Sequence, residues 1–270
     1  MAIKLSVLTF NTLGVPFFAR DITKRYEKTA ALINSADYDV VCLQELFTYY
    51  HLSIFKRIMK KYPHVMFQKN PFGPRGGLVI FSKIKLINPA FFTFSYPKNA
   101  HIPLYTKIAQ QGIFSVAIDQ TAIRILTTHL TSDTVHDLKP NNKLYTLIKN
   151  QSEEVVTSIN NYSQTEKLLI IAGDFNIAKH SELYNAMLKN AKLNDTFEKD
   201  ETPTYSPQRI PYFYAADADR CDYIFTKSTD RKTTIIKTES AFVEKVSLSN
   251  GKKSFLSDHI GLHCILEVNE

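Results

Sequence analysis

The sequence predicts an α+β sandwich in which two packed mixed β-sheets carry helices on their outer faces. Strand-like runs occur along the whole chain, and helical patterns interrupt groups of these runs instead of alternating strictly with them. No repeat, low-complexity tract or glycine/serine-rich linker divides the sequence. We therefore expect one domain that spans residues 1–270.

Eight runs are typical of strands because they are short, rich in β-branched or aromatic residues, and bounded by polar, glycine or proline residues. They cover residues 5–10, 40–43, 77–82, 113–118, 123–128, 168–172, 223–226 and 261–268. Residues 91–94 also alternate enough for an ordinary strand. The runs outnumber the helical patterns, which favours an architecture based on sheets.

Four stretches predict helices because their apolar residues recur three and four positions apart. They are residues 22–34, 53–61, 140–161 and 181–193. The third pattern is the clearest, and Pro140 near its start would suit a first helical turn. Ser181 would cap the fourth helix.

The composition is that of a folded globular protein. Hydrophobic residues make up 44% of the 270 positions and charged residues 22%, which excludes a disordered chain, a collagen, a coiled coil and a disulfide-rich miniprotein. A formal net charge of +7 favours anionic partners such as nucleic acid, an anionic membrane or a phosphorylated small molecule. A charge of this size also serves solubility alone.

The cysteines and the N-terminal segment give indications about metal binding, disulfides and cellular location. The three cysteines, Cys42, Cys221 and Cys264, are far apart and form no CxxC pair, so a zinc site is not expected. Their odd number gives no disulfide framework, and a single disulfide between two of them is an open alternative. Cys42 and Cys264 lie in apolar runs typical of a core. Neither a leader pattern nor an apolar run of about 18 residues occurs, which favours a cytoplasmic protein by default. Export without a leader, or a trimmed N-terminus, would look the same.

Polar side chains border six of the predicted strands. Buried polar groups are costly without partners, so these side chains would gather at one rim of the sandwich if their strands are neighbours. Each one alone has an ordinary explanation as a turn, loop or core residue. The ordered set is much harder to explain by chance, and it comprises Asn11, Glu45, His129, Asp174 with Asn176, Asp222, and Asp258 with His259.

The donor atoms of this set narrow the chemistry. Carboxylate and amide oxygens suit Mg²⁺ or Mn²⁺ better than zinc. Asp174 and Asn176 are two residues apart, so in an extended backbone their side chains share a face. One hard cation with two histidines suits phosphoester hydrolysis: the cation polarises a phosphoryl oxygen, one imidazole takes a proton from water, and the other protonates the leaving oxygen.

The ordered set resembles the endonuclease/exonuclease/phosphatase superfamily of metal-dependent phosphoesterases. The resemblance covers nearly the whole chain and implies a four-layer α/β sandwich with one active site at its rim. It also implies that Glu45 is the main metal ligand, with Asn11 nearby and Asp258 beside a second metal position. The motifs that carry it are Asn11, Leu43-Gln44-Glu45, His129, Gly173-Asp174-Phe175-Asn176, Asp222 within Cys-Asp-Tyr, and Ser257-Asp258-His259.

The same resemblance implies the catalytic roles. His259, oriented by Asp222, would be the general base. Asp174 would help to position the attacking water. Asn176 and His129 would contact the phosphate or the leaving group.

Within the superfamily the chain is most similar to neutral sphingomyelinases. The similarity rests on residues 10–16, in which Asn11 begins an Asn-x-x-Gly-Val-Pro motif, and on Arg20, Arg25 and residues 76–83 and 128–131. It implies Mg²⁺-dependent hydrolysis of sphingomyelin, or a related choline phospholipid, to ceramide and phosphocholine. Two residues are candidates for substrate binding, Lys107 and Gln151. Lys107 is displaced from the Gly-Lys-Gly-like stretch that is usual in the family. Gln151 would either face the site or lie on the helix surface.

Aromatic loops would let such an enzyme rest on a membrane. The candidates are Phe17 and Phe18, the Pro71-Phe72 pair, and Tyr212, Phe213 and Tyr214, although core packing explains each loop equally well. Two other functions of the same superfamily are alternatives to a sphingomyelinase: a DNA or RNA nuclease and a phosphoinositide phosphatase. A further alternative is a catalytically inactive module that binds a membrane or a protein. No obligate protein partner is evident.

Overall fold

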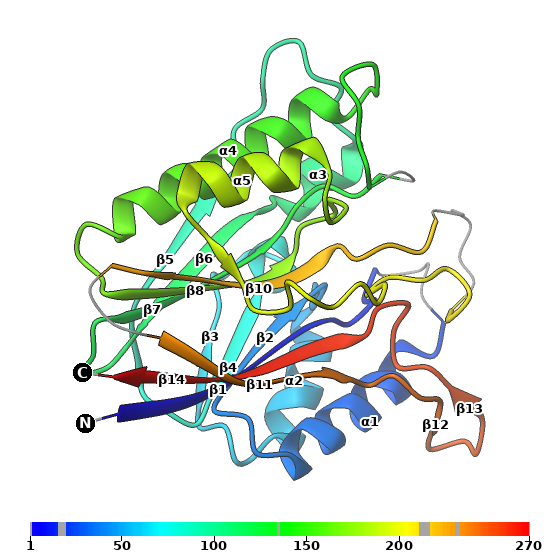
Figure 1. Ribbon diagram of the computed structural model, residues 1–270. Coiled ribbons are helices and arrows are strands. Elements are labelled where there is room, and N and C mark those ends of the chain that lie inside the picture. Colours follow the sequence, from blue (N-terminus) through cyan, green and yellow to red (C-terminus); the bar gives the residue numbers. More distant parts are fainter. Residues whose placement is uncertain (1, 16–19, 134–135, 211–216, 230–232, 270) are drawn as a thin grey trace.

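A computed structural model describes residues 2–15, 20–133, 136–210, 217–229 and 233–269. Two six-stranded mixed sheets pack face to face, and helices cover the outer face of each, which confirms the predicted four-layer sandwich (Figure 1). Apolar side chains fill three layers: one between the sheets and one between each sheet and its helices. None of the helices within the described residues is long and apolar enough to cross a bilayer.

The first sheet has the strand order β11-β14-β1-β2-β4-β3. β1 lies near its centre, parallel to β2 and antiparallel to β14. Its strands are β1 (Ala2–Asn11), β2 (Val40–Gln44), β3 (His64–Met66), β4 (Val79–Ser82), β11 (Thr233–Ala241) and β14 (Gly261–Asn269).

The second sheet has the order β5-β6-β7-β8-β10-β9. β7 and β8 are parallel, and β10 runs antiparallel to β8. Its strands are β5 (Leu86–Thr93), β6 (Gly112–Ile118), β7 (Ile123–His129), β8 (Leu168–Asp174), β9 (Asn194–Asp195) and β10 (Asp222–Ser228). A separate small hairpin consists of β12 (Val246–Ser247) and β13 (Lys253–Ser254).

The four predicted helices are present, with shifted ends. Ser181 caps its helix as predicted, because its side chain accepts a hydrogen bond from the Tyr184 backbone N–H. Pro140 is not a first-turn residue: the helix begins at Tyr145, after a turn in which Asn142 Oδ1 accepts from the Leu144 N–H. The helices are α1 (Ile22–Ser35), α2 (Tyr49–Ile58), α3 (Leu104–Ala109), α4 (Tyr145–Tyr162) and α5 (Glu182–Ala191), with a short 3₁₀ turn η1 (Arg75–Gly77).

Each sheet uses one face for the central core. α1 and α2 cover the outer face of the first sheet, and α4 and α5 that of the second (Figure 1). Cys42 and Cys264 lie in the core between the sheets, as predicted, and all three cysteines are buried free thiols.

Candidate active site

The strand period places the polar residues at one rim between the sheets. In β1, Val7 faces the central core, and Asn11 continues the same row of side chains two alternations later. In β8, Ala172 faces the core and Asp174 follows it in the same row. His129 ends the inward row of β7, and Asp222 begins that of β10. In the second sheet, His129 pairs with Asp174 and Asp174 pairs with Asp222. The three residues therefore lie side by side on neighbouring strands.

Asn11 joins the two sheets at this rim. Its Nδ2 donates to Glu45 Oε1 at 3.1 Å and to Asp174 Oδ2 at 2.9 Å. Its Oδ1 accepts from the Leu13 backbone N–H at 3.0 Å. The amide therefore fixes the distance between carboxylates that come from different sheets.

Glu45 follows β2 directly and turns the chain sharply. Its backbone has a φ of 63°, a left-handed conformation that is rare for a residue with a side chain and is common at functional sites. Its Oε2 accepts from the Gly14 N–H at 3.0 Å. A Cβ on Gly14 would lie 2.0 Å from the Glu45 carbonyl oxygen, so only glycine allows this close approach.

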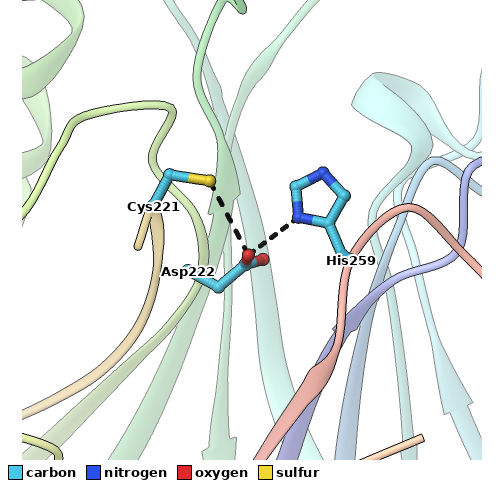
Figure 2. A group of neighbouring side chains, drawn as sticks. All are labelled: Cys221, Asp222 and His259. Carbon is cyan, nitrogen blue, oxygen red and sulfur yellow. Dashed lines mark hydrogen bonds and ion pairs between the residues drawn. The ribbon is translucent and has the colours of Figure 1, made fainter. Parts of the chain in front are cut away.

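His259 and Asp222 form a hydrogen-bonded pair. The imidazole Nδ1 lies 2.8 Å from Asp222 Oδ2, and Figure 2 shows the ring directed at this carboxylate. Asp222 is itself held by the Thr204 hydroxyl, which accepts its backbone N–H at 3.0 Å. Burial alone would lower the pKa of His259, but the charges of Asp222 and Asp174 raise it well above its usual value.

Asp174 lies between two imidazoles. Its Oδ2 is 3.7 Å from His259 Nε2 and 3.6 Å from His129 Nε2. His129 Nε2 also lies 4.0 Å from Glu45 Oε1. The two histidines thus approach the same carboxylate oxygen, so an acid and a base could act on one phosphoryl group.

Asp258 adds a further buried carboxylate. Its Oδ1 accepts from the Ser257 hydroxyl at 3.1 Å and lies 4.0 Å from His259 Nε2. Burial raises the pKa of Asp258, and the nearby charge of Glu45 raises it further. A concentration of buried negative charge is the environment that a bound cation compensates.

The oxygen donors at this rim fit a hard divalent cation. The carboxylates of Glu45, Asp174 and Asp258 would provide ligands that Mg²⁺ or Mn²⁺ prefers. The Asn11 amide presents its nitrogen to the carboxylates, so binding a metal through its oxygen would require the amide to rotate. Among the described residues, the group of metal-ligand side chains whose ligand atoms all lie within 4.8 Å of one another is a different one, Cys221, Asp222 and His259 (Figure 2). The hydrogen bond between Asp222 and His259 already uses two of its atoms.

Asn176 differs from the sequence expectation in its backbone. β8 ends at Asp174, and Asn176 has a φ of 50°, so the two residues do not continue one extended face. Asp174 Oδ1 instead accepts the Asn176 N–H at 2.9 Å in a tight turn. The Asn176 side chain donates to the Leu130 carbonyl at 3.0 Å, next to His129.

The two predicted substrate-binding residues have different positions. Gln151 is completely buried and does not lie on the helix surface: its Oε1 accepts the Thr131 N–H and its Nε2 donates to the Thr131 hydroxyl, both at 2.9 Å. It therefore holds the segment that follows His129. Lys107 is exposed on α3, outside the cluster. The aromatic candidates Phe17, Phe18, Tyr212, Phe213 and Tyr214 lie outside the described residues.

Sequence reasoning missed a cluster of aromatic rings beside His259. The Tyr205 ring lies 5.2 Å from the His259 ring and 5.3 Å from the His136 ring, measured between centroids. Burial lowers the pKa of His136, which favours its neutral form. Neither residue stands at the end of a predicted strand, so no pattern singled them out.

Arg25 has a role that its place on a helix did not suggest. An arginine on a helix is usually exposed, but the Arg25 side chain is buried. Its guanidinium donates to the carbonyl oxygens of Thr12 at 2.9 Å, Leu13 at 2.6 Å and Leu256 at 2.5 Å. It ties the loop after Asn11 to the segment before Asp258.

Known proteins resemble this chain in sequence and in fold. The model of the endonuclease/exonuclease/phosphatase family matches residues 8–259. A Drosophila melanogaster protein named "Putative neutral sphingomyelinase" is 22% identical over 272 residues, which cover 96% of this chain. The chain spans 60% of the length of that relative.

Solved structures share the fold at low sequence identity. TDP2 of D. rerio, complexed with a single-stranded DNA product, superposes with a TM-score of 0.71 at 17% identity, covering 97% of this chain and 98% of that one. Sphingomyelinase C from Streptomyces griseocarneus superposes with a TM-score of 0.65 at 19% identity, covering 99% and 100%. At these low sequence identities, the comparison shows a shared fold and nothing finer.

Proposed function

Because the chain belongs to the endonuclease/exonuclease/phosphatase family, we propose that it is a metal-dependent phosphodiesterase that hydrolyses sphingomyelin to ceramide and phosphocholine. The observation that carries the chemistry is Asp174, held between His129 and His259 and bridged to Glu45 by Asn11. The choice of a choline phospholipid rests on the relative named as a neutral sphingomyelinase and on the Asn-x-x-Gly-Val-Pro motif at Asn11.

Glu45 and Asp258, with Asp174 and the Asn11 amide beside them, would hold Mg²⁺, or alternatively Mn²⁺. A bound cation of this kind supplies Lewis acidity at a phosphoryl oxygen. The left-handed backbone of Glu45 and its bond from the Gly14 N–H fix the carboxylate before any ligand arrives. Such pre-organisation reduces the cost of assembling the site.

His259 would take the proton from the attacking water. Asp222 accepts the Nδ1 proton, which leaves Nε2 free to face the water and stabilises the imidazolium that forms. Asp222 and Asp174 keep the pKa of His259 high, and Asp174 also lies beside the proposed cation site. Compensation of the Asp174 charge would therefore make the imidazolium easier to deprotonate, as a general base requires.

His129 would act on the other side of the phosphoryl group. Its Nε2 faces Asp174 and Glu45, so a protonated ring could donate to a phosphate oxygen or to the leaving alcohol. The Asn176 amide bonds to the Leu130 carbonyl, and Gln151 bonds to Thr131. Together they fix the segment that carries this imidazole.

The test is Mg²⁺-dependent release of phosphocholine from sphingomyelin in mixed micelles, with digestion of supercoiled plasmid in parallel. We expect phosphocholine release by the wild type, none in chelator, and none with the Glu45→Gln variant. Plasmid nicking without phosphocholine release would keep the metal chemistry and move the substrate to nucleic acid. Full activity of Glu45→Gln would contradict the proposed metal site.

A further inference from the structure

We propose that α3 and the loop at Phe72 form a docking surface for a phospholipid bilayer at the rim of the active site. We call this surface the apolar rim and define it as Phe72, Leu104, Tyr105 and Ile108. The proposal rests on the lipid substrate proposed above and identifies the part of the chain that meets the membrane.

The apolar rim exposes large hydrophobic side chains. Leu104 and Ile108 are 72% and 66% exposed, and as residues four apart on a helix they lie on the same face of α3. Phe72 is 81% exposed, the highest value among the large hydrophobic residues that the structure describes. Complete burial of one such side chain is favourable by about 1.5–3 kcal/mol of free energy. Several of them exposed together therefore indicate a binding surface.

α3 is fixed beside His129. The Tyr105 hydroxyl donates to the Ser132 carbonyl at 2.6 Å, and the Thr106 hydroxyl lies 3.3 Å from that of Thr131. Thr131 is only two residues from His129, the last residue of β7. Figure 1 shows α3 at the end of the sandwich away from both chain termini, the end where β1 and β7 finish.

The Phe72 loop meets the same rim from the side of Glu45. A Cβ on Gly73 would lie 2.1 Å from the carbonyl oxygen of Phe47, two residues after Glu45. The chain then passes into η1, where a Cβ on Gly76 would lie 3.6 Å from the Gln110 carbonyl oxygen at the end of α3. The loop and the helix thus flank the metal ligand and the imidazole from two directions.

The charge of these segments suits lipid headgroups. Residues 67–77 and 96–112 contain Lys69, Arg75, Lys98 and Lys107 and no aspartate or glutamate. Segments that combine cations with exposed aliphatic side chains are typical of surfaces that enter the interface of a bilayer with anionic lipid. Leu104 and Ile108, the most exposed hydrophobic side chains of α3, offer apolar surface to a bilayer but no flat ring on which a nucleic-acid base could stack.

The first experiment measures binding without turnover. Protein is sedimented with vesicles of sphingomyelin and phosphatidylserine in the presence of EDTA, so that the lipid stays intact. We expect the Leu104→Ser/Ile108→Ser double variant to bind at least about tenfold more weakly than the wild type, because a factor of ten corresponds to about 1.4 kcal/mol. Ile236→Ser is the matched control for Ile108→Ser: Ile236 is 47% exposed on β11, and its replacement should leave binding unchanged.

Three outcomes overturn the docking surface: no vesicle binding by the wild type, equal binding by the double variant, or an equal loss in Ile236→Ser. Vesicle binding that depends on Leu104 and Ile108 but releases no phosphocholine would leave the docking surface standing and contradict the proposed substrate. If both proposals hold, the double variant loses activity on vesicles and keeps it on substrate dispersed in detergent.

Discussion

At the scale of single residues, the site depends on side chains that share carboxylates. Asp174 contacts Asn11, His129 and His259 at once, whereas Asp222 contacts only His259 of the two imidazoles and also accepts a long hydrogen bond from the Cys221 thiol at 3.8 Å. The two imidazoles therefore differ in their hydrogen-bond partners. His259 is oriented by its own carboxylate, whereas the Nδ1 of His129 is buried without a hydrogen-bond partner.

Removal of the His259 imidazole is therefore expected to affect turnover rather than folding. His259→Ala should lower turnover by about 10²–10⁴-fold, the usual contribution of a positioned proton acceptor. The measurement is the rate of phosphodiester hydrolysis alongside a thermal melt. A rate within a few-fold of the wild type would contradict the assignment of His259 as general base.

His263→Ala is the matched control. This second buried imidazole bonds to Ser6 and Glu239 on β1 and β11, away from the cluster. Its loss should lower the melting temperature and leave the turnover of the folded protein nearly unchanged.

At the scale of secondary structure, the sequence predicted the elements that bury an apolar face. The inward rows of β8 and β10 are apolar next to the polar residue at the rim, and in β1 and β7 one threonine stands between the apolar residues and that residue. Both the strands and the site residues could therefore be predicted from one alternating pattern. β11 was missed because no residue of this edge strand is fully buried and the strand carries no apolar row. α3 has six residues, too few to show a helical period.

The contacts that hold one element to another were beyond sequence reasoning. A guanidinium can reach carbonyl oxygens far along the chain, as Arg25 reaches Leu256, and no local pattern records such a partner. The left-handed turn at Glu45 was missed for a related reason: glutamate rarely adopts this conformation by local preference, so the turn depends on tertiary contacts. Asn176 adopts it more readily, and the Asp174 side chain holds its backbone N–H locally.

Arg25 is expected to act as a positioning residue for the metal site. Arg25→Met removes the donor to three buried carbonyl oxygens, and each unsatisfied group costs about 1–3 kcal/mol unless water replaces the donor. Because the freed segments carry Asn11 and Asp258, the Mg²⁺ concentration for half-maximal activity should rise by about 10–100-fold, the usual effect of losing a residue that orients ligands. The measurement is activity as a function of Mg²⁺ concentration.

Arg124→Met separates this effect from simple destabilisation. Arg124 is also buried and pairs with Glu166 at 2.9 Å, but its contacts lie in the second sheet, away from the metal ligands. We expect it to lower stability without changing the Mg²⁺ requirement. An unchanged requirement in Arg25→Met would show that Arg25 serves stability alone.

At the scale of the whole molecule, the site belongs to neither sheet alone. Asn11 and Glu45 border strands of the first sheet, and Asp258 and His259 precede its strand β14. His129, Asp174 and Asp222 belong to strands of the second sheet. The packing of the sheets through their common core therefore sets every distance between the two groups.

A cation bound between the sheets should stabilise the whole fold. Binding to the folded state alone adds about 2.7 kcal/mol at a concentration one hundred times the dissociation constant. We expect MgCl₂ to raise the melting temperature of the wild type and to have little effect on Glu45→Gln. Sodium chloride at equal ionic strength is the control, and an equal rise in both proteins would place the bound ion elsewhere.

The antiparallel pairing of β1 with β14 sets Ala2 opposite Asn269, and Figure 1 shows both ends of the chain far from α3. A biotin tag or a fluorescent fusion at either end would therefore hold the molecule by its far side and leave the catalytic rim facing outward. A short peptide that joins these adjacent ends would allow circular permutation, with new ends opened in a surface turn such as the exposed one at Asn250 and Gly251.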